Sequence, residues 1–190
     1  DNFNRCRTGI WYSREHYEHD IDSMDRFLSK DENGHYIVQK ITMCCYTAGS
    51  ILNPEAVTNV NRNTAKRLSD AINVLLHEDP RFNLELIVTD PRSKAAGEAI
   101  TYQKIGNPNK HTFYDSLQKL HKCFELDVEN GIFREKWGQE FICKITDLSL
   151  PYSILKVEYK DGYAHLNHIK LDLYSPFLRN NARRLTMIIA

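Results

Sequence analysis

The sequence predicts an α/β fold with a mixed sheet, in which an N-terminal β-α-β part flanked by helices precedes a C-terminal antiparallel meander. Two nearly continuous apolar runs, residues 36–46 and 82–89, each lead into a polar loop and then a helical pattern. Such a succession is typical of parallel strands joined by helical crossovers. Four strand-like runs with short polar joins then fill the last third of the chain, at residues 141–145, 152–159, 168–174 and 185–189.

Helical spacing of apolar residues supplies the remaining elements. We predict helices over residues 13–29, 64–77, 93–102 and 111–130. The sequence Lys160-Asp161-Gly162-Tyr163 is a hairpin signal between two of the late strands. We therefore divide the chain into an N-terminal helical segment, residues 1–35, that packs on a single α/β domain, residues 36–190.

Composition excludes several classes of protein. The 25 basic and 25 acidic residues cancel, so no overall charge favours nucleic acid. The five cysteines have no metal-ligand spacing. Cys44 and Cys45 lie inside an apolar run, where we expect them to be small hydrophobic residues of a protein in a reducing compartment rather than disulfide partners. No apolar run approaches the roughly 20 residues of a membrane span. We expect a cytoplasmic protein without membrane contact, metal or other cofactor. The first residue is aspartate, which is consistent with a piece of a longer protein.

The carboxyl ends of the two predicted parallel strands form the first candidate site, because open α/β sheets bind ligands there. Thr47 and Ser50 follow the first strand, and Asp90, Arg92 and Ser93 follow the second. The next helix begins at this turn, and its free N–H groups would attract an anion. The alternative is a capped turn, in which Asp90 or Ser93 accepts those N–H groups.

The sequence His168-Ile-Lys170-Leu-Asp172 is the second candidate site. Strand alternation places these three polar side chains on one face, where they could bind and protonate a phosphate. Lys156 and Glu158 on the preceding strand have the same polar phase. The alternative is a solvent-facing side of the strand with the intervening aliphatic residues inward. Cross-strand pairs of Lys156 with Asp172, or of Glu158 with Lys170, would then account for the charges.

Residues 41–46, 84–93, 150–158 and 169–176, in this order, resemble one half of the phospholipase D-like fold. The resemblance covers residues 36–190 and is greatest to degenerate versions in bacterial regulatory proteins, some of which follow a helix-turn-helix domain. Active members carry His-x-Lys with a later Asp, and two copies make one site. Here His168-Ile-Lys170 is present, but Ser175 stands where the Asp is expected. Another alignment places the motif strand at residues 152–154, which lack His and Lys.

The resemblance therefore implies a retained fold with lost chemistry, a homodimer, and a fused or partner DNA-binding domain outside this chain. Our leading hypothesis is a non-catalytic, ligand-sensing regulatory domain of a bacterial cytosolic protein. Its small anionic ligand, for which a nucleotide is one candidate, would lie between the Thr47 loop, the Asp90 turn and the strand that carries His168. The alternatives are a phosphodiesterase or nuclease that uses His168 and Lys170 across a dimer, and a protein-interaction module formed by residues 174–177 and Trp137.

Overall fold

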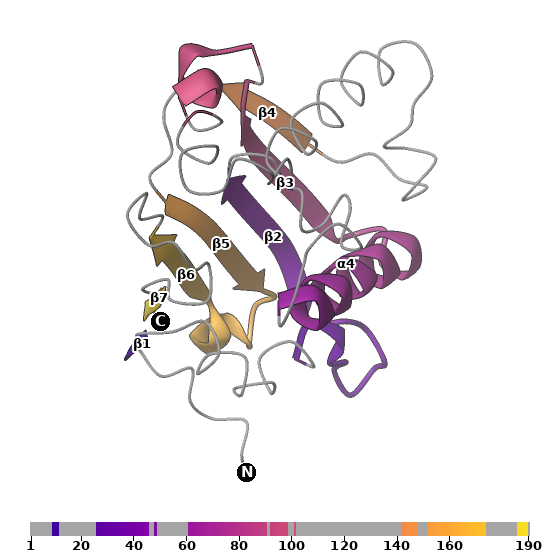
Figure 1. The fold of residues 1–190 in the computed structure, drawn as a ribbon. Helices are drawn as coiled ribbons and strands as arrows, with labels where there is room; N and C mark the ends of the chain where they lie inside the picture. Colours follow the sequence, from indigo (N-terminus) through magenta and orange to yellow (C-terminus); the bar gives the residue numbers. More distant parts are fainter. Residues whose placement is uncertain are drawn as a thin grey trace.

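A single mixed sheet forms the centre of the molecule (Figure 1). The computed structural model describes residues 9–11, 26–45, 48, 61–90, 92–98, 101, 142–147, 152–173 and 186–189. Seven strands of this part of the chain pair in the order β1-β7-β6-β5-β2-β3-β4. The strands are β1 (Gly9–Trp11), β2 (Val38–Cys45), β3 (Asn83–Thr89), β4 (Ile142–Thr146), β5 (Tyr152–Tyr159), β6 (His168–Leu173) and β7 (Thr186–Ile189).

The parallel part of the sheet begins with the predicted β-α-β unit. β2 and β3 are parallel neighbours joined through α4 (Asn61–Glu78), which confirms this part of the predicted fold. β4 is parallel to β3 at the edge of the sheet. The prediction that this run belongs to the antiparallel meander was wrong. The long stretch of chain between β3 and β4 permits a crossover, and a short strand pattern does not specify its partner.

The antiparallel part consists of β5, β6 and β7 in succession, with β1 added outside β7. β5 is also antiparallel to β2 and joins the two parts. β6 therefore runs in the same direction as β2, β3 and β4, and the four carboxyl ends share one edge of the sheet. The predicted hairpin connects β5 to β6, and Gly162 has a φ of 90° there, a conformation that favours glycine. η3 (Ala164–Leu166) completes the connection.

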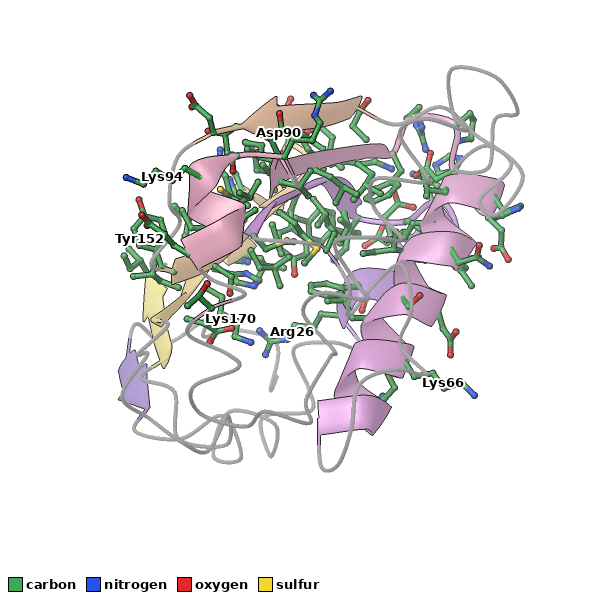
Figure 2. All side chains as sticks on the ribbon, turned by 45° about the horizontal axis from the view of Figure 1, so that its top comes forward. Arg26, Lys66, Asp90, Lys94, Tyr152 and Lys170 are labelled. Carbon is green, nitrogen blue, oxygen red and sulfur yellow. The ribbon has the colours of Figure 1, made fainter. Side chains whose placement is uncertain are left out.

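One face of the sheet, called the core face below, carries the main hydrophobic core. Alternate residues of β2, β3 and β5 point to it, and α4 covers it with a stripe of buried side chains (Figure 2). Burial of each large aliphatic side chain contributes roughly 1.5–3 kcal/mol. The buried residues include Ile41, Met43, Leu84, Leu86, Val88, Leu155 and Val157 of the strands, and Leu68, Ala71, Ile72, Leu75 and Leu76 of α4.

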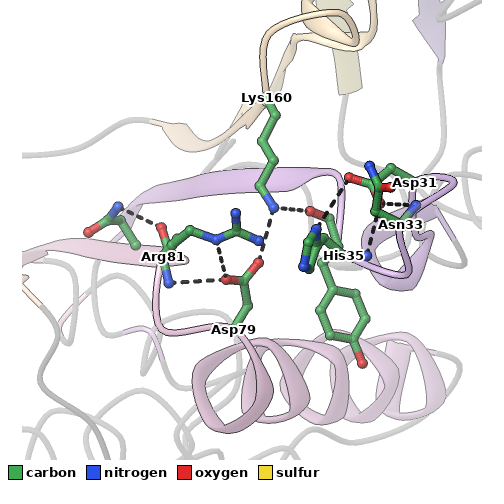
Figure 3. A network of polar contacts seen from close by, with 8 residues as sticks. Asp31, Asn33, His35, Asp79, Arg81 and Lys160 are labelled. Atoms are coloured by element: carbon green, nitrogen blue, oxygen red, sulfur yellow. Dashed lines mark hydrogen bonds and ion pairs between the residues drawn. The ribbon is translucent and has the colours of Figure 1, made fainter.

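A network of polar contacts, called the polar junction below, lies at the end of the sheet opposite the carboxyl ends of β2 and β3 (Figure 3). Lys160, directly after β5, donates to the Tyr36 carbonyl oxygen and lies 3.3 Å from the Asp79 carboxylate. Asp79 is buried and also accepts the Arg81 backbone N–H at 3.1 Å. Burial alone would raise the pKa of Asp79, but the bonds from Arg81 and Lys160 hold it below its usual value. The junction ties the β5–β6 turn to the starts of β2 and β3.

The remaining predicted helices are only partly described. Residues 94–98 and 101 are helical within the predicted helix 93–102. Of the predicted helix 13–29, the structure describes η1 (Arg26–Leu28), a 3₁₀ turn whose Phe27 is buried in the core. The predicted helix 111–130 lies outside the described residues. No helix in the described part of the chain is long and apolar enough to cross a membrane.

Candidate functional site

The side chains of His168, Lys170 and Asp172, called the β6 row below, lie on the core face of the sheet. Their partners across β5 are Val157, Leu155 and Ser153, and directly opposite residues of antiparallel strands share a face. The three residues are only 5, 6 and 6% exposed. The alternative interpretation, in which these side chains face solvent, was therefore wrong. Strand alternation separates the polar from the aliphatic residues, but it does not say which set is covered.

Lys170 and Asp172 form a buried ion pair within β6. The distance from Lys170 Nζ to Asp172 Oδ2 is 3.4 Å, and the side chains are 7% and 9% exposed. Buried charges are tolerated only when they are paired, because each loses its hydration. The pair therefore keeps a cation and an anion at a position where an apolar strand would place aliphatic residues.

Lys156 and Glu158 do not join the β6 row. They lie on the opposite face of the sheet, called the second face below, and pair with each other at 2.8 Å. Lys40 of β2 stands opposite Glu158 and binds Glu85 at 2.7 Å. The predicted cross-strand pairs were therefore wrong, because the β5–β6 register places each expected pair on opposite faces.

His168 is a buried imidazole with one nitrogen already bonded. Its Nδ1 lies 3.0 Å from the Leu166 carbonyl oxygen, so in the neutral ring Nδ1 carries the proton and Nε2 carries the lone pair. Burial lowers the pKa of His168; the Leu166 carbonyl opposes that effect, and the positive charges of Arg26 and Lys170 add to it. The Tyr159 ring lies against it, with centroids 6.2 Å apart.

Arg26 is the residue of this site that the sequence did not suggest. It comes from η1, far from β6 in the chain, and Figure 2 shows it in the same region as Lys170. Its positive charge acts on the His168 ring. No motif or spacing connects it to the β6 row, because only the packing of the N-terminal segment on the core brings the two together.

The turn after β3 is capped by its own side chains. Asp90 accepts hydrogen bonds from the Arg92 backbone N–H at 2.8 Å and from the Arg92 guanidinium at 3.0 and 3.1 Å. Ser93 Oγ accepts the Ala96 N–H at 3.2 Å, as a helix cap does. These contacts are those of the capped-turn alternative, and an anion here would compete with Asp90 for Arg92.

The loop after β2 is described only at Ala48, whose N–H donates to Cys45 Sγ at 3.2 Å; Thr47 and Ser50 lie outside the described residues. At the end of β3, Thr89 is fully buried, and its Oγ1 has no hydrogen-bond partner among the described residues.

Within the β6 row, Asp172 lies toward the carboxyl ends of the strands, where the Asp90 turn follows β3, whereas His168 begins β6 beside the β5–β6 turn. Neither residue adjoins the Asp90 turn. β5 and β2 stand between β6 and β3. Three strand spacings of about 4.8 Å separate the two strands by roughly 14 Å. A single ligand that touched both would need the length of a nucleotide or dinucleotide.

Comparison of the chain with family models, curated proteins and solved structures found no match. The phospholipase D-like resemblance therefore stays a prediction that rests on the residues quoted for it. In the described part of the chain, no three His, Cys, Asp or Glu residues are grouped so that they could hold a metal ion. Residues 174–177 and Trp137, on which the interaction-module hypothesis depends, lie outside that part.

Proposed function

We propose that this chain is a non-catalytic regulatory domain that binds a small anionic ligand through the β6 row. The burial of His168, Lys170 and Asp172 on the core face supports this proposal. An apolar replacement of a buried ion pair is often neutral or stabilising, so the fold alone gives little reason for charges here. Buried polar clusters with a shifted pKa are frequent at functional sites.

The charges near the β6 row favour an anion. Among the residues that the structure describes, Lys170 and Arg26 bring positive charge and Asp172 brings negative charge to this place, beside His168. Electrostatic attraction is stronger at a buried position than in water. A phosphate group, alone or on a nucleotide, has the charge and the acceptor oxygens for such a place. The homodimer and the DNA-binding partner domain stay part of this proposal, and size-exclusion chromatography with light scattering tests the dimer.

The experiment measures binding of inorganic phosphate, a nucleoside monophosphate and a dinucleotide by calorimetry. The double variant Lys170→Met/Asp172→Leu removes both charges of this pair together, and should weaken binding about tenfold or more. The matched control is Lys156→Met/Glu158→Leu, the equivalent pair on the second face, which should bind as the wild type does. If none of the probes binds the wild-type protein at millimolar concentration, or if both double variants bind equally well, the proposal is wrong.

The second candidate function is a metal-independent phosphodiesterase, which the tautomer of His168 favours. The Leu166 carbonyl holds the Nδ1 proton, so Nε2 is the nucleophilic nitrogen, next to Lys170 on the same strand face. In the family that the chain resembles, a second His–Lys pair completes the site, and in this candidate a second copy of the chain supplies it across a dimer. Hydrolysis of bis(p-nitrophenyl) phosphate in EDTA, lost in His168→Asn, would support this candidate. No turnover by the purified protein would exclude it.

A further inference from the structure

The surroundings of His168 differ between the two sides of its ring. On the Nδ1 side, the Leu166 carbonyl oxygen accepts the ring proton at 3.0 Å. In the described part of the chain, the charged and titratable groups near the ring are Arg26 from η1, Lys170 from β6 and the phenol of Tyr159 from β5. Asp172 is paired with Lys170 at 3.4 Å, so one of the two nearby cations is partly neutralised.

We propose that anion binding at the β6 row is coupled to the uptake of one proton by His168. This inference rests on the function proposed above and adds its regulation. Nε2 takes the proton from solvent and imidazole becomes imidazolium, while Nδ1–H keeps its bond to the Leu166 carbonyl. No covalent bond of the ligand or of the protein changes.

The coupling follows from the charges. Without a ligand, Arg26 and Lys170 oppose a third positive charge in a buried place, and burial itself keeps the pKa of His168 below its ordinary value. A bound anion cancels part of this repulsion and favours the protonated ring. Linkage is reciprocal, so a ligand that raises the proton affinity of His168 must itself bind more tightly to the protonated domain.

The domain is therefore a sensor of two inputs, an anion and the proton. Affinity rises as the pH falls, by up to about tenfold per pH unit between the pKa values of His168 in the free and bound domains. Outside that interval the affinity is constant. A pH change within that interval would then load or empty the site at a fixed ligand concentration.

The test uses sulfate as the probe, because its charge does not change between about pH 5 and pH 8, and any pH dependence belongs to the protein. Calorimetric titration of the wild-type chain over this range should give a dissociation constant that decreases as the pH falls. His168→Asn keeps an amide N–H that can donate to Leu166 but cannot take a proton, and its sulfate affinity should be independent of pH. The matched control is His165→Asn, because His165 is an exposed residue of the adjoining η3. It should keep the wild-type pH dependence.

The outcomes separate this coupling from the proposed function. If sulfate binds the wild type equally well at both ends of the range, the coupling is wrong and anion binding stands. If sulfate, phosphate and the nucleotide probes all fail to bind, the proposed function fails and the coupling fails with it. Should His168→Asn not fold, the pKa of His168 in the wild type is read from its ring proton shift by NMR, with and without sulfate. An upward shift supports the coupling, and an unchanged pKa overturns it.

Discussion

Replacement of Asp172 by asparagine should destabilise the fold far more than replacement of Glu158 by glutamine. Both carboxylates pair with a lysine two residues earlier on the same strand, but the Asp172 pair is buried, whereas the side chains of Lys156 and Glu158 are 44% and 31% exposed. At 3.4 Å and an effective dielectric constant of about 20, the buried attraction is about 5 kcal/mol. Loss of one partner of a buried pair typically costs about 3–5 kcal/mol, whereas an exposed pair contributes about 0–1 kcal/mol.

The comparison is informative because distance alone predicts the opposite order. The exposed pair is the shorter one, at 2.8 Å against 3.4 Å. Equilibrium unfolding in urea, followed by circular dichroism, gives the free energy of unfolding of both variants and of Lys170→Met/Asp172→Leu. We expect the double variant to lose less stability than Asp172→Asn, because neither charge of the pair then stays buried without the other. A larger loss for Glu158→Gln than for Asp172→Asn would refute the reasoning from burial.

Three further predictions concern stability. The free energy of unfolding should fall as the pH decreases below 6.5, the ordinary His pKa, because the pKa of His168 is lower in the folded than in the unfolded chain. Urea unfolding at several pH values should show that the free energy of unfolding of His168→Asn depends less on pH than that of the wild type. Lys160→Met should cost about 1–3 kcal/mol, because it leaves the buried Asp79 carboxylate with Arg81 but without Lys160, whereas Lys94→Met at an exposed helical pair should change the melting midpoint little. Gly162→Ala should cost about 1 kcal/mol through its positive φ, whereas Gly97→Ala in a helix should be neutral or stabilising; a loss at Gly97 alone would contradict this.

Local patterns were sufficient to predict the first part of the fold. The continuous apolar runs of β2 and β3 and the periodic stripe of α4 are determined by near neighbours in the chain, and the structure has these elements close to the expected bounds. The β5–β6 hairpin was predicted from a glycine in a short polar join, and Gly162 does adopt a positive φ. Each of these elements is determined by residues that are close together in the chain, so a local sequence pattern is enough to predict it.

The candidate site could be predicted only in part, because its decisive features are not local. The alternation of polar and aliphatic residues in β6 was visible in the sequence. Which face of the sheet the polar residues occupy depends on the register with β5 and on what covers the sheet. The same register separates Lys156 and Glu158 from the β6 row. Arg26 reaches the site through tertiary packing. The short β4 run does not specify by itself that β3 is its parallel partner.

The outermost strand pair of the antiparallel part has a consequence for how the chain folds. β1 pairs with β7, so that Gly9 stands opposite Ile188. On a ribosome this pairing cannot form until the residues of β7 have emerged, long after β2, α4 and β3 are free to assemble. Contacts between such distant segments carry a high loop-closure cost and slow the folding of a domain. We expect β1 and β7 to join last, which leaves an edge of β6 unpaired during synthesis and makes that interval the one in which association with other chains is most probable.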